Sequence, residues 1–178
     1  MSDERKRRPR PPLDGEGIER LALFYAGRYA TTRAKLGSYL KRKLAERGWA
    51  GQGEPPVEAL VERLSALGYV DDRAFAANRA ASLGRRGYGE RRLRDSLKAA
   101  GIQEADAAEA RDQARADSWR SALRFAERRR LGPFAEVEPD RAGREKALAA
   151  MVRAGHPFEL ARKVVTARPG TIPDSDDC

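Results

Sequence analysis

A ten-residue pattern occurs three times in this chain, as LKRKLAERGW at residues 40–49, LRDSLKAAGI at residues 93–102 and ALAAMVRAGH at residues 147–156. In each copy two apolar residues stand four positions apart, and a glycine follows after another four. The glycines are Gly48, Gly101 and Gly155, so the pattern recurs after 53 and then 54 residues. A fixed period is typical of tandem structural units, and this one is long enough for three helices in each unit.

Each copy predicts where a helix ends. Apolar residues four positions apart lie on one face of a helix. Glycine commonly follows the last helical residue, because it adopts a left-handed conformation at little steric cost. Helix starts are predicted at residues that favour the N-cap position or stand at the spacing of a hydrophobic staple, namely Thr32, Asp71, Gly89 and Gly143.

A further helix is predicted on each side of every copy. The preceding helices are expected at residues 21–29, 72–83 and 118–130, and the following ones at residues 57–67, 105–115 and 158–167. Ala, Leu, Arg and Glu dominate, and no long stretch alternates apolar and polar residues, which favours helix throughout. Because residues 105–130 contain no Gly or Pro, the two helices predicted there either run close together or fuse.

These patterns predict an all-α fold, an elongated tandem array of three three-helix repeats at residues 17–69, 70–117 and 118–168. A disordered basic arm is expected at residues 1–16, and a disordered acidic tail at residues 169–178. One such repeat cannot bury its apolar face alone, so stability is expected to come from stacking between neighbouring repeats.

The charge composition indicates what kind of partner the protein binds, and says little about its fold. The 178 residues carry a formal net charge of +9, and 35% of them are charged. No apolar run approaches the roughly 20 residues needed to cross a bilayer, and the first residues do not resemble a secretory signal. The single cysteine, Cys178, excludes an internal disulfide. We expect a cytoplasmic monomer with no membrane partner.

No catalytic, cofactor or metal site is expected. The sequence contains no GxxxxGK[ST] loop for phosphate. The only histidine, His156, lacks the partners needed for a metal site or a nucleophile–base pair, and it is interpreted as a helix-end residue. The carboxylates are scattered among arginines at helical spacing, as on a solvated face. The sequence therefore predicts a protein that is not an enzyme.

The second repeat carries the candidate binding surface. In the helix after Gly89, Leu93 and Leu97 point inward, and three cations spaced i, i+3 and i+7 fall on the opposite side. With the residues just before this helix they form a basic edge predicted to bind a partner, comprising Arg85, Arg86, Tyr88, Arg91, Arg94 and Lys98. Such an edge suits an acidic protein groove or phosphates. An interpretation of equal weight is that these residues form an ordinary solvated helix face, with Tyr88 packed as a hydrophobic staple.

Other basic residues are spread over the first and third repeats, which suits an extended surface better than a pocket. This secondary basic surface consists of Lys41, Arg42, Lys43, Arg128 and Arg129. Trp49 and Trp119 are large enough that both are expected to be substantially buried. Stacking on nucleic-acid bases is the less favoured interpretation of the two rings.

The stretch LGYVDDRAFAANRAASLGRRGYGERRLRDSLKAAGI at residues 67–102 resembles the signature region of the RecX family of bacterial regulatory proteins. It begins with a GY-x-DD-x-x-FA element formed by Gly68, Tyr69, Asp71, Asp72, Phe75 and Ala76. An RGYG turn at residues 86–89 follows, and then a helix that closes at Gly101 and Ile102. The flanking repeats extend the resemblance to about residues 18–167.

The resemblance implies a regulator without catalytic activity of its own. Such a protein would bind the RecA recombinase filament on DNA and restrain its ATPase, recombinase and co-protease activities in DNA repair, recombination and the SOS response. Single- or double-stranded DNA is a further partner that the resemblance allows. The residues alone leave open a stand-alone basic DNA-binding protein and a helical scaffold for other partners.

This chain departs from the family pattern in two places. The middle helix of the first repeat carries about one extra turn, in the stretch TTRAKLGSYLKRKL at residues 31–44. Gly37 lies inside this stretch and predicts a bend or a later start, because glycine disfavours a helix interior. The third repeat has AGHPFELA at residues 154–161, where the family usually has an aromatic residue after the glycine.

Overall fold

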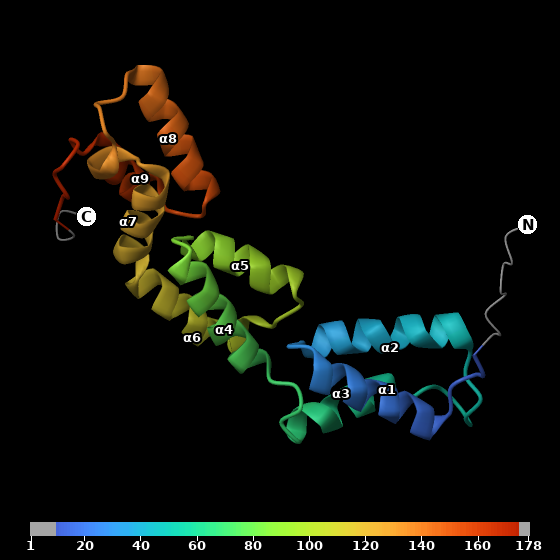
Figure 1. Ribbon diagram of the computed structural model, residues 1–178. Helices are drawn as coiled ribbons and strands as arrows, with labels where there is room; N and C mark the ends of the chain where they lie inside the picture. The colour runs from blue at the N-terminus through green and yellow to red at the C-terminus, as the bar shows by residue number, and fades with distance from the viewer. Residues whose placement is uncertain (1–9, 175–178) are drawn as a thin grey trace, which may run out of the picture. The chain divides into compact units, whose positions relative to one another are not determined.

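The computed structural model describes residues 10–174, and their regular secondary structure is helical (Figure 1). The elements are α1 (Gly15–Arg28), α2 (Arg33–Arg47), α3 (Val57–Ala66), α4 (Asp72–Arg85), α5 (Glu90–Ala99), α6 (Glu104–Ala116), α7 (Ser118–Arg129), the 3₁₀ helix η1 (Gly132–Phe134), α8 (Arg141–Arg153) and α9 (Phe158–Thr166). The all-α prediction is confirmed. The chain divides into two compact units, Met1–Asp72 and Arg73–Cys178.

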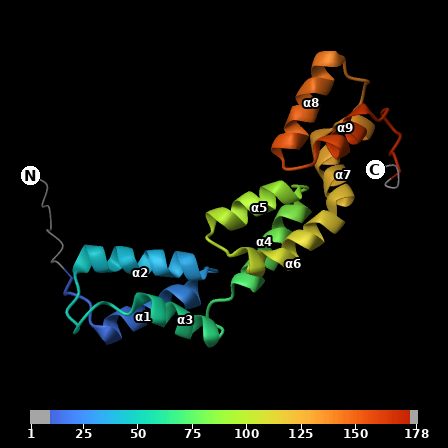
Figure 2. The same cartoon turned by 180° about the vertical axis from the view of Figure 1, so that it is seen from behind.

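The first unit is a three-helix bundle in which α1, α2 and α3 all touch one another (Figures 1 and 2). Its core is built from aliphatic side chains at helical spacing, among them Ile18, Leu36, Leu40 and Leu64, each at most 1% exposed. Trp49 is half-buried against this core. Its indole N–H donates to the carbonyl of Gly53 at 3.0 Å.

The start of the first unit corrects the predicted boundary of the arm. Leu13 is 1% exposed, and its backbone pairs on both sides of Trp49, because its N–H donates to Gly48 at 3.0 Å and its carbonyl accepts from Ala50 at 2.8 Å. Helix α1 begins at Gly15, six residues before the expected position, because the Asp14 side chain caps it. Residues 13–16 therefore belong to the folded unit.

The tail prediction is corrected in the same way. The N–H of Gly170 donates to the carbonyl of Pro133 at 2.8 Å, so the start of the predicted tail is attached to the third repeat. Residues 1–9 of the predicted arm and residues 175–178 of the predicted tail, including Cys178, lie outside the described residues.

The glycines of the repeated pattern end their helices as predicted. Gly48, Gly101 and Gly155 all have positive φ, at 81°, 73° and 97°. Of the predicted N-caps, Thr32 and Gly89 are confirmed, whereas Gly143 is wrong. Helix α8 is capped three residues earlier by Asp140, whose carboxylate accepts from the N–H of Gly143 at 2.7 Å.

The second unit contains two cores that share one side chain. Helices α4, α5 and α6 enclose one cluster, and α7, α8 and α9 enclose the other. Both clusters pack against Tyr88. The second core is rich in alanine and is filled by Met151 and Val164. Trp119 is half-buried against it, like Trp49 in the first unit.

Helices α6 and α7 do not fuse. A single residue, Asp117, separates them and has the dihedral angles of neither helix interior. The two helices nevertheless follow one another closely, as the views in Figures 1 and 2 show. The absence of Gly and Pro therefore correctly predicted a short junction.

Gly37 lies inside α2, which runs unbroken from Arg33 to Arg47. A Cβ atom added there would lie 4.0 Å from Cγ2 of Val61, an ordinary van der Waals contact. We therefore expect Gly37→Ala to raise the free energy of unfolding of the first unit by about 1 kcal/mol. The measurement is urea unfolding followed by Trp49 fluorescence in a Trp119→Phe background.

Gly68→Ala is the control, because Gly68 has equally open surroundings but a φ of +78°. A β-carbon in that conformation costs about 1 kcal/mol or more, so this variant should lose stability. Destabilisation by Gly37→Ala would show that α2 needs a bend at this glycine.

Candidate functional site

The α4–α5 turn lies directly against the third repeat. The N–H of Gly89 donates to the carbonyl of Ala154 at 3.0 Å, and that of Arg91 donates to Gly155 at 3.3 Å. A Cβ atom on Gly89 would lie 2.3 Å from the Gly155 carbonyl oxygen, and one on Gly155 would lie 2.5 Å from the Arg92 nitrogen. Two main chains therefore meet where no side chain fits. We call this contact the seam.

Side chains complete the seam on both sides of the glycines. The Ser121 hydroxyl donates to the carbonyl of Tyr88 at 2.8 Å. The ring of Tyr88 is half-buried, with its centroid 6.2 Å from that of Phe125. Tyr88 thus packs between the two cores, one of which contains Leu93.

Arginines from both repeats gather around residues 84–88. From α7, Arg124 donates to the carbonyl of Gly84 at 3.4 Å, and Arg128 donates to the carbonyl of Arg86 at 2.8 Å. The guanidinium carbons of Arg86 and Arg92 lie 5.0 and 5.9 Å from the ring centroid of Tyr88. With the exposed Arg85 these residues form what we call the arginine cluster, consisting of Arg85, Arg86, Arg92, Arg124 and Arg128.

The arginine cluster is not neutralised by acidic side chains. Within residues 10–174, none of its five guanidinium groups has a carboxylate within 4.0 Å. Guanidinium groups match carboxylates and phosphates in shape and bind them through two parallel hydrogen bonds. Positive charges gathered around one turn also raise the local concentration of anions. The site is therefore suited to an acidic or phosphate-bearing partner.

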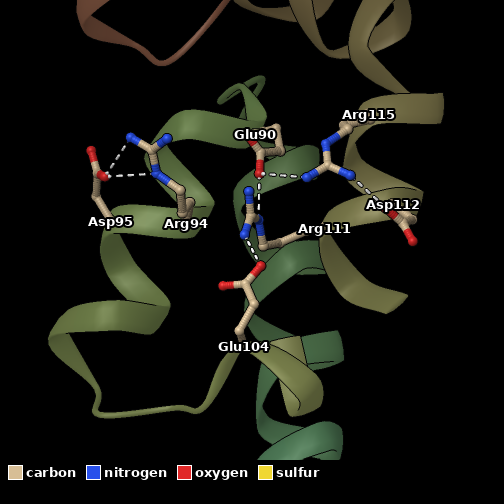
Figure 3. Close-up of polar contacts among 7 residues, drawn as sticks. All are labelled: Glu90, Arg94, Asp95, Glu104, Arg111, Asp112 and Arg115. Carbon is tan, nitrogen blue, oxygen red and sulfur yellow. Dashed lines mark hydrogen bonds and ion pairs between the residues drawn. The ribbon is translucent and has the colours of Figure 1, made fainter. Parts of the chain in front are cut away.

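The structure separates the predicted basic edge into different environments. Arg91 reaches across the seam, where its side chain donates to the carbonyl of Val152 at 2.9 Å. Arg94 pairs with Asp95 at 3.2 Å (Figure 3). Lys98 is exposed and has no carboxylate partner within the described part of the chain. Arg85, Arg86 and Tyr88 lie together at the turn.

The secondary basic surface is divided more sharply. In the first unit, Lys41 pairs with Glu58 at 2.8 Å, while Arg42 and Lys43 both pair with Glu46. The hydrogen bond from Lys43 lowers the pKa of Glu46, so this carboxylate stays charged to lower pH. In the second unit, Arg128 joins the arginine cluster, and Arg129 lies over the ring of Phe125 at 5.8 Å.

Two members of the arginine cluster were missed by sequence reasoning. Arg124 stands four residues before Arg128, so the two share one face of α7, and this i,i+4 spacing was the available signal. Arg92 lies between Arg91 and Arg94 and carries no comparable signal. Only the position of the Tyr88 ring brings it into the cluster.

An ion-pair network holds α5 against α6 (Figure 3). Glu90 in the first turn of α5 accepts from Arg111 at 2.6 Å and lies 3.7 Å from Arg115. Arg111 also contacts Glu104. The hydrogen bond to Glu90 raises the pKa of Arg111. The network fixes the start of α5, and with it the turn that carries the arginine cluster.

We expect Arg111→Met to lower the free energy of unfolding of the second unit by about 2 kcal/mol, because Glu90 would remain largely buried and lose its principal partner. Arg115→Met is the matched control. Its side chain is 54% exposed, so this change should cost less than about 1 kcal/mol. Urea unfolding followed by Trp119 fluorescence in a Trp49→Phe background measures both. Equal losses would contradict the role of the network.

The only histidine is a seam residue. His156 is 3% exposed, and its Nε2 lies 2.9 Å from the carbonyl of Gly87, so the neutral ring donates there. Its Nδ1 is buried without a hydrogen-bond partner among the described residues. Burial lowers the pKa of His156 below its usual value, outweighing the hydrogen bond to Gly87. The folded protein therefore favours the uncharged ring.

Below a pH of about 6.5 His156 is protonated in the unfolded chain. In the folded protein its lowered pKa keeps the ring neutral to lower pH. The second unit should therefore have its full histidine-dependent stability above pH 7. It should lose up to about 1.4 kcal/mol per pH unit between the unfolded pKa and the lowered folded pKa. Unfolding free energies at pH 7.5, 6.5 and 5.5 test this. His156→Gln should flatten the dependence, and an unchanged slope would show that other groups cause it.

Residues 10–174 contain neither a metal-binding cluster nor a helix that could span a membrane. No three side chains among His, Cys, Asp and Glu are placed to share a metal ion in that range. No helix there is both long enough and apolar enough to pass through a bilayer.

A family model described as the second three-helix domain of RecX matches residues 71–110, the segment from Asp71 through α6 that includes the arginine-rich turn. The chain is 34% identical over 160 residues to a protein named regulatory protein RecX from Myxococcus xanthus, covering 85% of this chain and 86% of the relative. A protein of the same name from Thermus thermophilus is 39% identical over 103 residues, covering 58% and 69%.

Solved structures show the same fold. The crystal structure of RecX from Lactobacillus salivarius superposes with a TM-score of 0.66, covering 84% of this chain and 93% of the other, at 15% identity. A second RecX crystal structure gives a TM-score of 0.63 at 18% identity. Because the Myxococcus relative matches over most of both chains, the protein belongs to the RecX family of regulatory proteins.

Proposed function

We propose that this protein binds the RecA recombinase filament on DNA and restrains its ATPase, recombinase and co-protease activities. The observation that carries the proposal is the arginine cluster, five guanidinium groups without a carboxylate partner within the described residues. Family membership supports a regulatory role. The protein would act in the cytoplasm as a non-enzymatic regulator in DNA repair and recombination.

The build of the cluster suits a partner that repeats acidic or phosphate groups along its length. Two of its side chains are held by main-chain carbonyls, and the turn itself is fixed by the seam. Such preorganisation reduces the entropy lost on binding. A protein filament wrapped on DNA would offer both carboxylates and phosphates to these groups. Lys98 and Arg94 on α5 would extend the contact.

The test compares two triple variants of equal charge. Arg85→Gln/Arg86→Gln/Arg92→Gln removes three charges from the cluster without removing a side-chain hydrogen bond found within residues 10–174. The control, Arg141→Gln/Arg144→Gln/Arg162→Gln, removes three charges that are already paired with Glu145, Glu138 and Glu159. ATP hydrolysis by RecA on single-stranded DNA is measured as each protein is titrated.

The wild type and the control should inhibit hydrolysis when they are present in amounts near equimolar with RecA. The cluster variant should need about tenfold more protein for the same inhibition. Circular dichroism should show unchanged helix content in all three. If the wild type leaves RecA hydrolysis unaltered at equimolar amounts, the proposed function is wrong. If both variants weaken equally, general charge rather than the cluster makes the contact.

The alternative function is that of a stand-alone DNA-binding protein. It requires tight binding to bare DNA with a steep salt dependence, and it requires no effect on RecA beyond competition for DNA. Inhibition that persists when DNA is in large excess would argue against it.

A further inference from the structure

One stretch of the first unit combines positive charge and aromatic rings to an unusual degree. Residues 20–45 contain seven Lys or Arg residues and no Asp or Glu. The same stretch holds three of the five tyrosines of the chain, together with Phe24. These residues occupy α1, α2 and the turn between them. The arginine cluster belongs to the other unit, so this surface is not explained by the proposed function.

The rings and cations form a continuous ladder. Arg28 lies over both Phe24 and Tyr29, 5.9 and 5.8 Å from their ring centroids. Tyr29 lies 5.2 Å from Tyr25, which stacks at 4.2 Å on Tyr39 with nearly parallel planes. The ladder ends where Arg42 and Lys43 approach the Tyr39 ring, at 5.6 and 5.9 Å.

The two sides of the ladder differ in burial. Tyr25 and Tyr39 are half-buried and pack against the core of the first unit, so they anchor it. Phe24 is 58% exposed and Tyr29 is 49% exposed, so the core needs neither ring. A single exposed aromatic residue needs no explanation. Here two exposed rings contact the same arginine, and one of them continues the half-buried tyrosine stack. Such an arrangement is an ordered aromatic and cationic surface.

We propose that this aromatic ladder binds single-stranded nucleic acid, with unpaired bases stacking on Phe24 and Tyr29 and phosphates bound by Arg28, Arg42 and Lys43. Single-strand sites combine aromatic faces for successive bases with cations that follow the backbone. Arginine planes also stack on bases. A duplex has its bases already stacked, so its faces are closed to these rings.

The existing ion pairs do not oppose this ligand. Lys41, Arg42 and Lys43 pair with Glu58 or Glu46 on the surface, where side chains of the five residues are 22–75% exposed. Exposed pairs contribute little, so a phosphate can replace the carboxylate. Arg28 has no carboxylate partner within the described residues and lies between the two exposed rings. It is thus the cation best placed for the strand.

The experiment measures binding of the full-length protein to a fluorescein-labelled fifteen-nucleotide oligo(dT) by anisotropy, beside a duplex of equal length. Phe24→Ala and Tyr29→Ala should each weaken oligo(dT) binding at least about fivefold while changing duplex binding less. Phe158→Ala is the matched control, because this ring is 53% exposed but stands on α9 of the other unit. It should leave both affinities unchanged.

Arg28→Gln should reduce the slope of log affinity against log salt by about 0.7, the value for one phosphate contact on a single strand. An oligonucleotide carrying 5-iododeoxyuridine gives an independent readout that needs no variant. Photocrosslinking to the wild type should place the base on the peptide that contains Phe24 and Tyr29.

Unchanged oligo(dT) affinity in both alanine variants would overturn the proposal, as would crosslinks confined to the second unit. If the same variants lose inhibition of RecA hydrolysis but keep oligo(dT) affinity, the ladder is a protein-docking face and the proposal is again wrong. Failure here leaves the RecA proposal standing, because that assay depends on the arginine cluster.

Discussion

The second unit depends on a contact between two stretches of main chain. Gly89 and Gly155 approach so closely that a β-carbon on either would clash with the opposite backbone. Such proximity matters in a protein whose third-repeat core is largely alanine, because small side chains bury little apolar area. Close backbone approach restores dispersion contacts that larger side chains would otherwise supply. It also explains the buried neutral histidine, since His156 follows Gly155 directly and its ring is enclosed with the glycines.

The seam also decides where positive charge gathers. Because α7 lies against the α4–α5 turn, its arginines donate to main-chain carbonyls of that turn. Carbonyl oxygens orient a guanidinium group without neutralising it, whereas a carboxylate does both. Like charges are tolerated at this density because the groups remain at the surface, where water and salt screen them. The first unit differs, since Glu46 and Glu58 accompany its basic helix α2.

The two units therefore present different surface chemistry. The arginine cluster offers charge and hydrogen bonds in a fixed array, which suits carboxylate and phosphate oxygens. The aromatic ladder offers π faces with cations between them, which suits flat and uncharged surfaces next to phosphates. A regulator of a protein–DNA filament would meet both kinds of group. Their separation into two compact units means that each surface is testable without altering the packing of the other.

The sequence by itself determined the helices and most of their ends, because amphipathic spacing, N-caps and glycine C-termini act within one or two turns. Predicted and observed helices such as 57–67 and Val57–Ala66 differ by a residue. Local patterns also predicted Arg85, Arg86 and Tyr88 as part of a basic edge, and the structure places Arg86 beside the Tyr88 ring. They could not show that Arg91 turns to Val152, or that Arg124 meets a turn 40 residues away. Those contacts exist only because two glycines, 66 residues apart in sequence, let one repeat pack on the next, and such long-range packing leaves no local signal in the chain.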